Sequence, residues 1–195
     1  MDPAHSASFT VYLRWPGWAP SAEVLVNGQP VAAGAARRGS YIAVSRTWNP
    51  GDSISLSLPM PPTAMAANPR VTDTYGRVAL QRGPLVYALE QIDQAGMSLP
   101  DLFIRPATPI TVESRRDLLG GVTVLKISGQ AAERSISEEP LYQPLTATTN
   151  RAKRLVTLTF IPYYARGNRE PSPMEVWVPA SKDVLVEDSG LTTSE

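Results

Sequence analysis

The sequence predicts an all-β protein built from two successive antiparallel β-sandwich units, with little or no helix. Nineteen prolines and thirteen glycines divide its 195 residues into segments too short for typical helices. Within these segments apolar and polar residues alternate with a period of two, the pattern of a half-buried strand. Turn motifs join the segments, among them Asn27-Gly28 and the Asn-Pro-Gly-Asp sequence at 49–52. With 43% hydrophobic and 18% charged residues, the composition is that of a globular protein with its own core.

The first unit is expected to span residues 1–62. Its strands are predicted at Phe9–Arg14, Glu23–Asn27, Gln29–Ala32, Ser40–Ser45 and Ser53–Leu58. Trp48, next to a turn, is expected in the core. Because a sandwich commonly has seven or more strands, we expect this unit to be incomplete on its N-terminal side. An unpaired strand edge would then favour self-association.

The proline-rich stretch from Pro59 to Arg70 has no apolar period, so residues 63–76 are predicted to form a linker or crossover. The second unit is expected at 77–195, ending in a disordered C-terminal tail. Its strands are predicted at Arg77–Gln81, Leu85–Glu90, Ile110–Glu113, Val122–Ser128, Leu155–Pro162 and Met174–Val178. Residues 91–109 and 129–150 are expected to form long loops.

Charge and residue content exclude several classes of function. Eighteen basic and eighteen acidic residues cancel, which argues against nucleic acid and membrane surfaces as partners. The chain has no cysteine, so it can form neither a disulfide, a thiolate nucleophile nor a cysteine-ligated zinc site. The only histidine is His5, in a polar segment, which provides no basis for a catalytic triad or a histidine metal site. We therefore expect no catalytic residue, no metal site and no cofactor in this chain.

Several carboxylates are candidates for a glycosidase pair, because glycoside hydrolysis needs two of them across a cleft. None of the candidates stands in a recognisable motif, so all are expected to be solvated: Glu90, Asp93, Glu138, Glu139, Glu170 and Glu175.

Aromatic residues near turns are the candidates for carbohydrate or domain contacts. Trp15 and Trp18 flank Pro16-Gly17, where they either stack on sugar rings or close the end of the core. Residues 160–179 hold the densest aromatic and polar stretch, and tyrosine and arginine are frequent interface anchors. The candidates in this stretch are Tyr163, Tyr164, Arg166, Asn168 and Arg169.

Five segments together carry a family resemblance: FTVYLRWPGWA, VLVNGQPV, GSYIAVSRTWNPGDSISLSLPM, GRVALQRGPLVYALE and IPYYARGNREPSPMEVWVP. In their order and spacing they resemble the C-terminal part of glycoside hydrolase family 127, the bacterial β-L-arabinofuranosidases. The resemblance covers about Phe9 to Pro179, and residues 91–150 contribute no motif to it. Two positions depart from the family pattern: Trp15 replaces an aliphatic residue, and Arg166 replaces a tryptophan.

The resemblance implies a non-catalytic chain that supports a barrel it does not itself contain. Family members carry an N-terminal (α/α)6 catalytic barrel with a cysteine nucleophile, a glutamate acid/base and a zinc bound largely by cysteines. This chain would then pack against the missing barrel of its parent enzyme and have no activity alone. The alternative is a carbohydrate-binding module for plant arabinan-type glycans. The resemblance implies a bacterial protein and leaves its compartment open between cytoplasm and periplasm.

Overall fold

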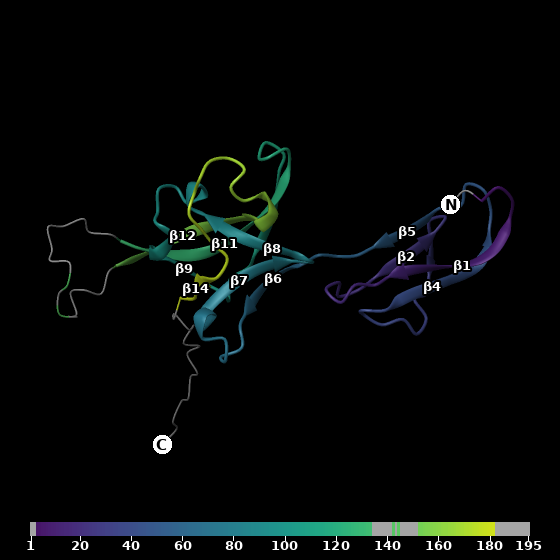
Figure 1. The fold of residues 1–195 in the computed structure, drawn as a ribbon, viewed down its shortest axis with the longest axis horizontal. Helices are drawn as coiled ribbons and strands as arrows, with labels where there is room; N and C mark the ends of the chain where they lie inside the picture. The colour runs from purple at the N-terminus through teal and green to yellow at the C-terminus, as the bar shows by residue number, and fades with distance from the viewer. Residues whose placement is uncertain (1–2, 134–141, 143, 145–151, 182–195) are drawn as a thin grey trace, which may run out of the picture. The chain divides into compact units, whose positions relative to one another are not determined.

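The computed structural model describes residues 3–133, 142, 144 and 152–181 (Figure 1). Strands dominate, and the helical segments among these residues are short 3-10 turns, so the predicted all-β class is confirmed. No helix in the described ranges is long and apolar enough to cross a membrane. The predicted C-terminal tail and most of the predicted loop after residue 133 lie outside the described residues.

The chain divides into two compact units. The first consists of Met1–Pro61 with Arg82–Pro84, and the second of Pro62–Gln81 with Leu85–Glu195. Inside the predicted linker, the structure places a strand, β6 (Pro62–Ala66), which pairs with β7 (Arg77–Arg82). A strand can begin with proline at a sheet edge, where its missing N–H removes no ladder hydrogen bond.

The first unit contains five antiparallel strands in two sheets. The strands are β1 (Ala7–Arg14), β2 (Glu23–Val26), β3 (Gln29–Val31), β4 (Tyr41–Trp48) and β5 (Ile54–Ser57). One sheet is β1-β4 and the other is β3-β2-β5. Among the described residues, β1 and β4 pair only with each other, so this sheet has two edges without a strand partner.

The core of the first unit draws on alternate residues of β2 and β4. Its fully buried members are Val24, Val26, Ile42, Val44 and Trp48. Trp48 is in the core, as predicted, and its indole N–H donates to the carbonyl oxygen of Phe9 at 3.1 Å. A bulky aromatic side chain with its polar atom satisfied gives this small core much of its buried apolar area.

Two turn motifs that are separate in the sequence form one hydrogen-bonded network. Asn27 adopts a φ of 51°, as the Asn-Gly hairpin turn requires. Its side-chain amide donates to Asp52 at 2.8 Å and its side-chain oxygen accepts from the backbone N–H of Ser53 at 2.8 Å. Asp52 also accepts from the backbone N–H of Asn49 at 2.9 Å, closing the second turn. These bonds, led by that from Asn49 and with Arg46 nearby, hold the pKa of Asp52 below its ordinary value of 3.8.

Asp52→Asn tests this network through its pH dependence. A carboxyl whose pKa is lower in the folded state stabilises the fold above its unfolded pKa and loses that contribution as the pH falls through the folded pKa. We expect the variant to be less stable than the wild type at pH 7, and the difference to shrink as the pH falls below 3.8. Urea denaturation from pH 7 to pH 3 measures both. Curves that remain parallel over the whole range would show that the carboxylate does not act through its charge.

The second unit is one nine-stranded antiparallel sheet. Besides β6 and β7, its strands are β8 (Leu85–Glu90), β9 (Leu102–Ile104), β10 (Thr111–Arg115), β11 (Val122–Ala132), β12 (Lys153–Pro162), β13 (Met174–Glu175) and β14 (Val178–Pro179). The order is β10-β11-β12-β8-β7-β14, with β9 on β11 and β13 on β8. The prediction of a loop throughout 91–109 was therefore wrong at β9, whose three residues are too few to show a period.

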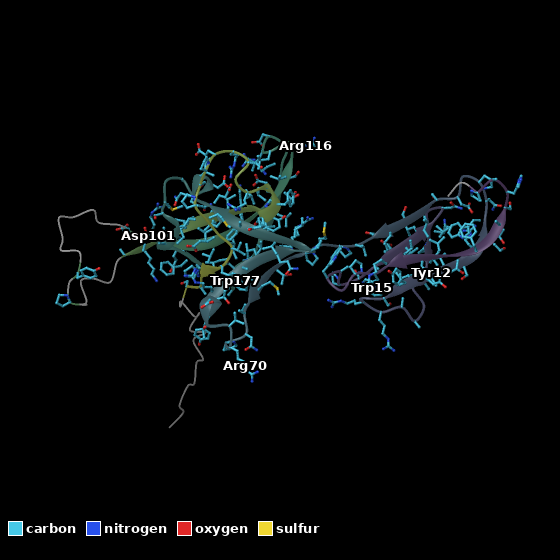
Figure 2. The ribbon with its side chains drawn as sticks, in the orientation of Figure 1. Tyr12, Trp15, Arg70, Asp101, Arg116 and Trp177 are labelled. Atoms are coloured by element: carbon cyan, nitrogen blue, oxygen red, sulfur yellow. The ribbon has the colours of Figure 1, made fainter. Side chains whose placement is uncertain are left out.

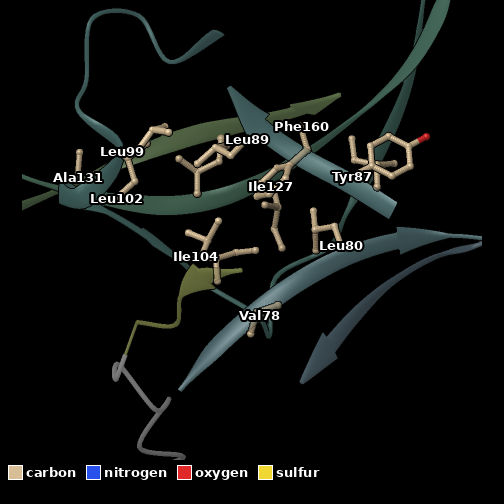
Figure 3. Packing of buried hydrophobic residues seen from close by; sticks show 13 residues of the cluster. Val78, Leu80, Tyr87, Leu89, Leu99, Leu102, Ile104, Ile127, Ala131 and Phe160 are labelled. Atoms are coloured by element: carbon tan, nitrogen blue, oxygen red, sulfur yellow. The ribbon is translucent and has the colours of Figure 1, made fainter. Parts of the chain in front are cut away.

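This sheet curls until β14, at one end of the order, reaches β9, which pairs with β11 near the other end. β9 pairs with β11, and a parallel bridge joins Ile104 to Ala180, just after β14. The backbone N–H of Ser181 donates to the carbonyl of Ile104 at 2.7 Å. The inner face thus encloses the main core, in which Leu80, Leu89 and Phe160 lie between the facing strands (Figure 3).

Gly129 permits this closure. It lies within β11, opposite Val156 of β12 on one side and Ile104 of β9 on the other. A Cβ atom here would lie 2.7 Å from the carbonyl oxygen of Phe103 and 2.6 Å from Cδ1 of Leu158. β11 was predicted to end at Ser128 but continues to Ala132. Gly129 therefore marks a close approach of two backbones and not a turn.

Gly129→Ala should destabilise the protein by about 1–3 kcal/mol, the usual cost of overpacking. The backbone of β9 has to move, since a carbonyl oxygen cannot rotate away as a side chain can. The matched control is Gly17→Ala, because Gly17 has no positive φ and a methyl group added there would meet no atom within 4 Å. The control should change the free energy of unfolding by less than about 0.5 kcal/mol. Equal stability of the two variants in urea denaturation would contradict the close approach.

Candidate functional site

The two candidate tyrosines of the second unit, Tyr163 and Tyr164, lie in the segment that follows β12, and both are exposed. This segment begins with a 3-10 turn, η5 (Tyr163–Ala165). Tyr163 and Tyr164 are 44% and 65% exposed, whereas Ala165 is buried against the outer face of the sheet. The guanidinium of Arg166 lies 5.8 Å from the centre of the Tyr163 ring. We call Tyr163, Tyr164 and Arg166 the tyrosine platform.

An ion-pair network with Glu90 and Asp93 attaches this segment to the sheet. Glu90, at the end of β8, is only 1% exposed and accepts from the backbone N–H of Gly167 at 2.7 Å. Arg169 donates to Glu90 at 2.5 Å and to both oxygens of Asp93 at 2.7 Å. Asn168 adds a bond of 3.1 Å from its side-chain amide to the carbonyl oxygen of Ala165. One arginine therefore joins the segment to both β8 and η2 (Gln91–Asp93).

The hydrogen bonds of the network explain how Glu90 can be buried. The hydrogen bond to Asp93 and then that to Glu90 raise the pKa of Arg169, although burial alone would lower it. The fork of a guanidinium matches a carboxylate with two parallel bonds, which are among the strongest hydrogen bonds in proteins. Removing one partner would leave a buried charge uncompensated, so the network favours a single arrangement of the segment.

Further contacts fix the C-terminal end of the segment and the adjoining edge of β8 and β12. The backbone N–H of Gln91 donates to the carbonyl of Pro173 at 2.9 Å, and that of Ile92 donates to the Ser172 hydroxyl at 3.2 Å. The buried amide of Gln94 donates to the carbonyls of Glu90 and Thr159, both at 2.9 Å. Gln94 thereby continues the β8–β12 ladder beyond Leu89, the last β8 residue paired with β12.

The predicted solvation of the carboxylates was wrong for Glu90, which is buried and paired. Asp93 is also ion-paired, and Glu175 is half-buried 3.6 Å from Arg77. Glu170 is exposed, as predicted, while Glu138 and Glu139 lie outside the described residues. The role of Glu90 has no signal in the sequence, because its partner Arg169 is 79 positions away and no local pattern joins the two.

The two candidate tryptophans belong to the first unit, whereas the tyrosine platform belongs to the second. Trp15 and Trp18 are both half-buried. Trp15, labelled in Figure 2, packs against the first core, and its indole N–H donates to the carbonyl of Ala19 at 3.1 Å. Its backbone also bonds to Gly39 and Ser40. Trp15 is thus mainly a structural residue of this turn.

Arg169→Met tests the network. With Glu90 left as a buried charge, the variant should lose about 3 kcal/mol of unfolding free energy. The combined variant with Glu90→Gln should recover part of this loss, because coupled neighbours are not additive. Arg116→Met, at an exposed arginine (Figure 2), is the control and should have an effect within about 0.5 kcal/mol. Urea denaturation that gives additive losses would contradict the coupling.

Comparisons with known proteins agree with this architecture. The family model for the glycoside hydrolase family 127 C-terminal domain matches residues 62–179, and that for the β-L-arabinofuranosidase GH127 middle domain matches 1–60. A non-reducing end β-L-arabinofuranosidase of Bifidobacterium longum subsp. longum is 36% identical over 183 residues, covering 89% of this chain and 26% of that protein.

Solved structures give the same result. A GH127 β-L-arabinofuranosidase from Geobacillus stearothermophilus T6 matches with a TM-score of 0.79 and 36% identity, over 92% of this chain and 28% of that one. Another GH127 β-arabinofuranosidase matches with a TM-score of 0.76 and 29% identity, over 90% and 28%. The chain thus spans just over a quarter of the length of these relatives. With its two β units matching two successive family domains, this chain belongs to glycoside hydrolase family 127.

Proposed function

We propose that this chain is the non-catalytic β-rich part of a β-L-arabinofuranosidase-type enzyme, and that it packs against and supports an (α/α)6 catalytic barrel. The domain matches support this, because they cover the middle and C-terminal domains of the family and leave most of each relative's length unmatched. The arabinofuranosidase activity named for the relatives would belong to the complete parent enzyme.

The observation that carries the proposal is the fixed tyrosine platform. Tyrosine and arginine are frequent anchors of protein interfaces. Here they are exposed on a segment that Glu90 and Asp93 hold through Arg169, so little conformational entropy remains to be lost on contact. A catalytic role for the same carboxylates is disfavoured, since both already accept hydrogen bonds from Arg169.

The residues of this chain do not fit the zinc site of the family. That zinc is bound largely by cysteines, and this chain contains none. Within the described ranges, no three histidine or acidic side chains gather closely enough to hold a metal ion. No step of the parent's reaction is assigned to this chain.

In the carbohydrate-binding alternative, the stacking platform is Trp15 or Trp18. The hydrogen bond of Trp15 and its packing against the first core leave less of its ring for a sugar. This disfavours Trp15 as a binding platform.

A chimera with the Bifidobacterium relative tests the proposal. The purified chain should not hydrolyse an aryl β-L-arabinofuranoside, with or without zinc, whereas the relative with its matching region replaced by this chain should. In the chimera, Tyr163→Ala and Tyr164→Ala should each cost more than about 1 kcal/mol of interface free energy, seen as a lower melting temperature. Tyr75→Ala, at another exposed tyrosine, is the control.

Two results would contradict the proposal. One is turnover by the purified chain that survives repurification and disappears in a carboxylate variant such as Glu175→Gln. The other is a chimera whose melting temperature is as insensitive to the platform variants as to the control, which would place the barrel contact elsewhere.

A further inference from the structure

The outer face of the β1–β4 sheet has a chemistry of its own. One face of these strands points into the first core, and the other presents eight side chains. They are Ser8, Thr10, Tyr12, Arg14, Tyr41, Ala43, Ser45 and Thr47. We call this surface the hydroxyl–tyrosine face. Apart from the methyl group of Ala43, it carries only hydroxyl groups, phenol rings and one guanidinium.

Half of the face is a ladder of paired hydroxyl groups. Ser8 and Thr47 lie opposite each other with their oxygens 2.7 Å apart, and Thr10 and Ser45 follow at 2.8 Å. Each hydroxyl has one donor and two acceptor positions, so each pair retains one donor and several lone pairs for a ligand. A shallow cavity of about 370 Å³ lies at this end of the sheet, lined by the two hydroxyl pairs and by Phe9 and Arg46 of the opposite face.

The other half presents two exposed phenol rings. Tyr12 is 66% exposed and Tyr41 58% exposed. Tyr12 lies opposite Ala43, whose small side chain leaves the Tyr12 ring uncovered (Figure 2). Tyr41 is the diagonal neighbour of Tyr12, and the guanidinium of Arg14 lies 5.1 Å from the centre of its ring. Arg14 is held in turn by the carbonyl of Gly39.

The geometry points to a binding surface for a neutral oligosaccharide on this face. A sugar ring combines an apolar C–H face with a rim of hydroxyl groups that both donate and accept hydrogen bonds. The phenol rings offer flat apolar area with a polar tip, and the adjoining ladder offers groups that donate and accept in the same way. β1 is 8 residues long, so the face extends for roughly 26 Å, enough for several sugar units in a row.

Charge favours a neutral glycan over an ionic ligand. The face has no carboxylate, and its one guanidinium already contacts Tyr41 and a backbone carbonyl. An acidic polymer would meet a single cation, Arg14, whose guanidinium already has partners, and a basic polymer would meet no anion. The surface differs from the tryptophan turn of the alternative function and does not depend on the barrel contact, so either proposal can fail alone.

Titration of the ¹⁵N-labelled chain with neutral arabino-oligosaccharides and cello-oligosaccharides tests the inference. We expect saturable chemical-shift changes in residues 7–14 and 41–48, with the two sugars distinguishing a pentose from a hexose preference. Tyr12→Ala and Tyr41→Ala should each weaken binding by about fivefold or more, as expected for the loss of a stacked ring. Tyr12→Phe should keep most of the affinity, because the ring stays.

Controls separate binding from loss of the fold. Tyr75→Ala removes an exposed tyrosine of the second unit and should leave the affinity unchanged. Both tyrosines of the face are exposed, so their alanine variants should retain the wild-type near-ultraviolet signal of buried Trp48. The inference is overturned if neither sugar gives saturable shifts, if the shifts map elsewhere, or if the folded Tyr12→Ala/Tyr41→Ala double variant binds as the wild type does.

Discussion

The closure of one sheet around its own core is the constraint on which the second unit depends. The chain has no cysteine for a disulfide, and in the described ranges no helix long enough to cover a sheet. The inner face is therefore buried mainly by the sheet itself, through the bridge between Ile104 and Ala180, with a contribution from short segments such as η3 (Leu99–Asp101). That bridge requires β9 to pair closely with β11, on the side opposite β12, which the missing side chain of Gly129 allows. The closure thus depends on a single residue without a side chain.

Closure of the sheet also leaves apolar residues on its outer face that must be covered. Val124 and Ile161 point outward from the sheet and need a cover, which η5 and the turn around Leu118 provide. Glu90 lies on the same outward side of β8 as Ala88, the partner of Ile161. A buried carboxylate is costly unless it is paired, so covering this face requires a cation from the covering segment. Arg169 supplies it, and the exposed tyrosines follow from where that segment is fixed.

The sequence predicts most strands, because their signal is local, but not the contacts that make the two units specific. The alternation in β4 and β5 shows which residues face a core, and Asn27-Gly28 marks the hairpin between β2 and β3. β9 is too short for a period, and Gly129 in isolation resembles a strand end. Arg169 was selected for its residue type, yet its pairing with Glu90 bridges 79 positions and has no local pattern. Pairing across such distances depends on the sheet order, which alternation alone does not determine.

The two proposed surfaces rest on different kinds of support, which makes them independent. The tyrosine platform is held by charges, so its geometry is sensitive to the loss of a single group such as Arg169. The hydroxyl–tyrosine face is held by a strand ladder whose opposite side is buried apolar core, and loss of one of its side chains leaves that ladder intact. Substitutions at separate sites without shared partners act additively. Under the two proposals, a substitution in the hydroxyl–tyrosine face would alter glycan binding without weakening the contact of the tyrosine platform, because the two surfaces share no residue and no core position.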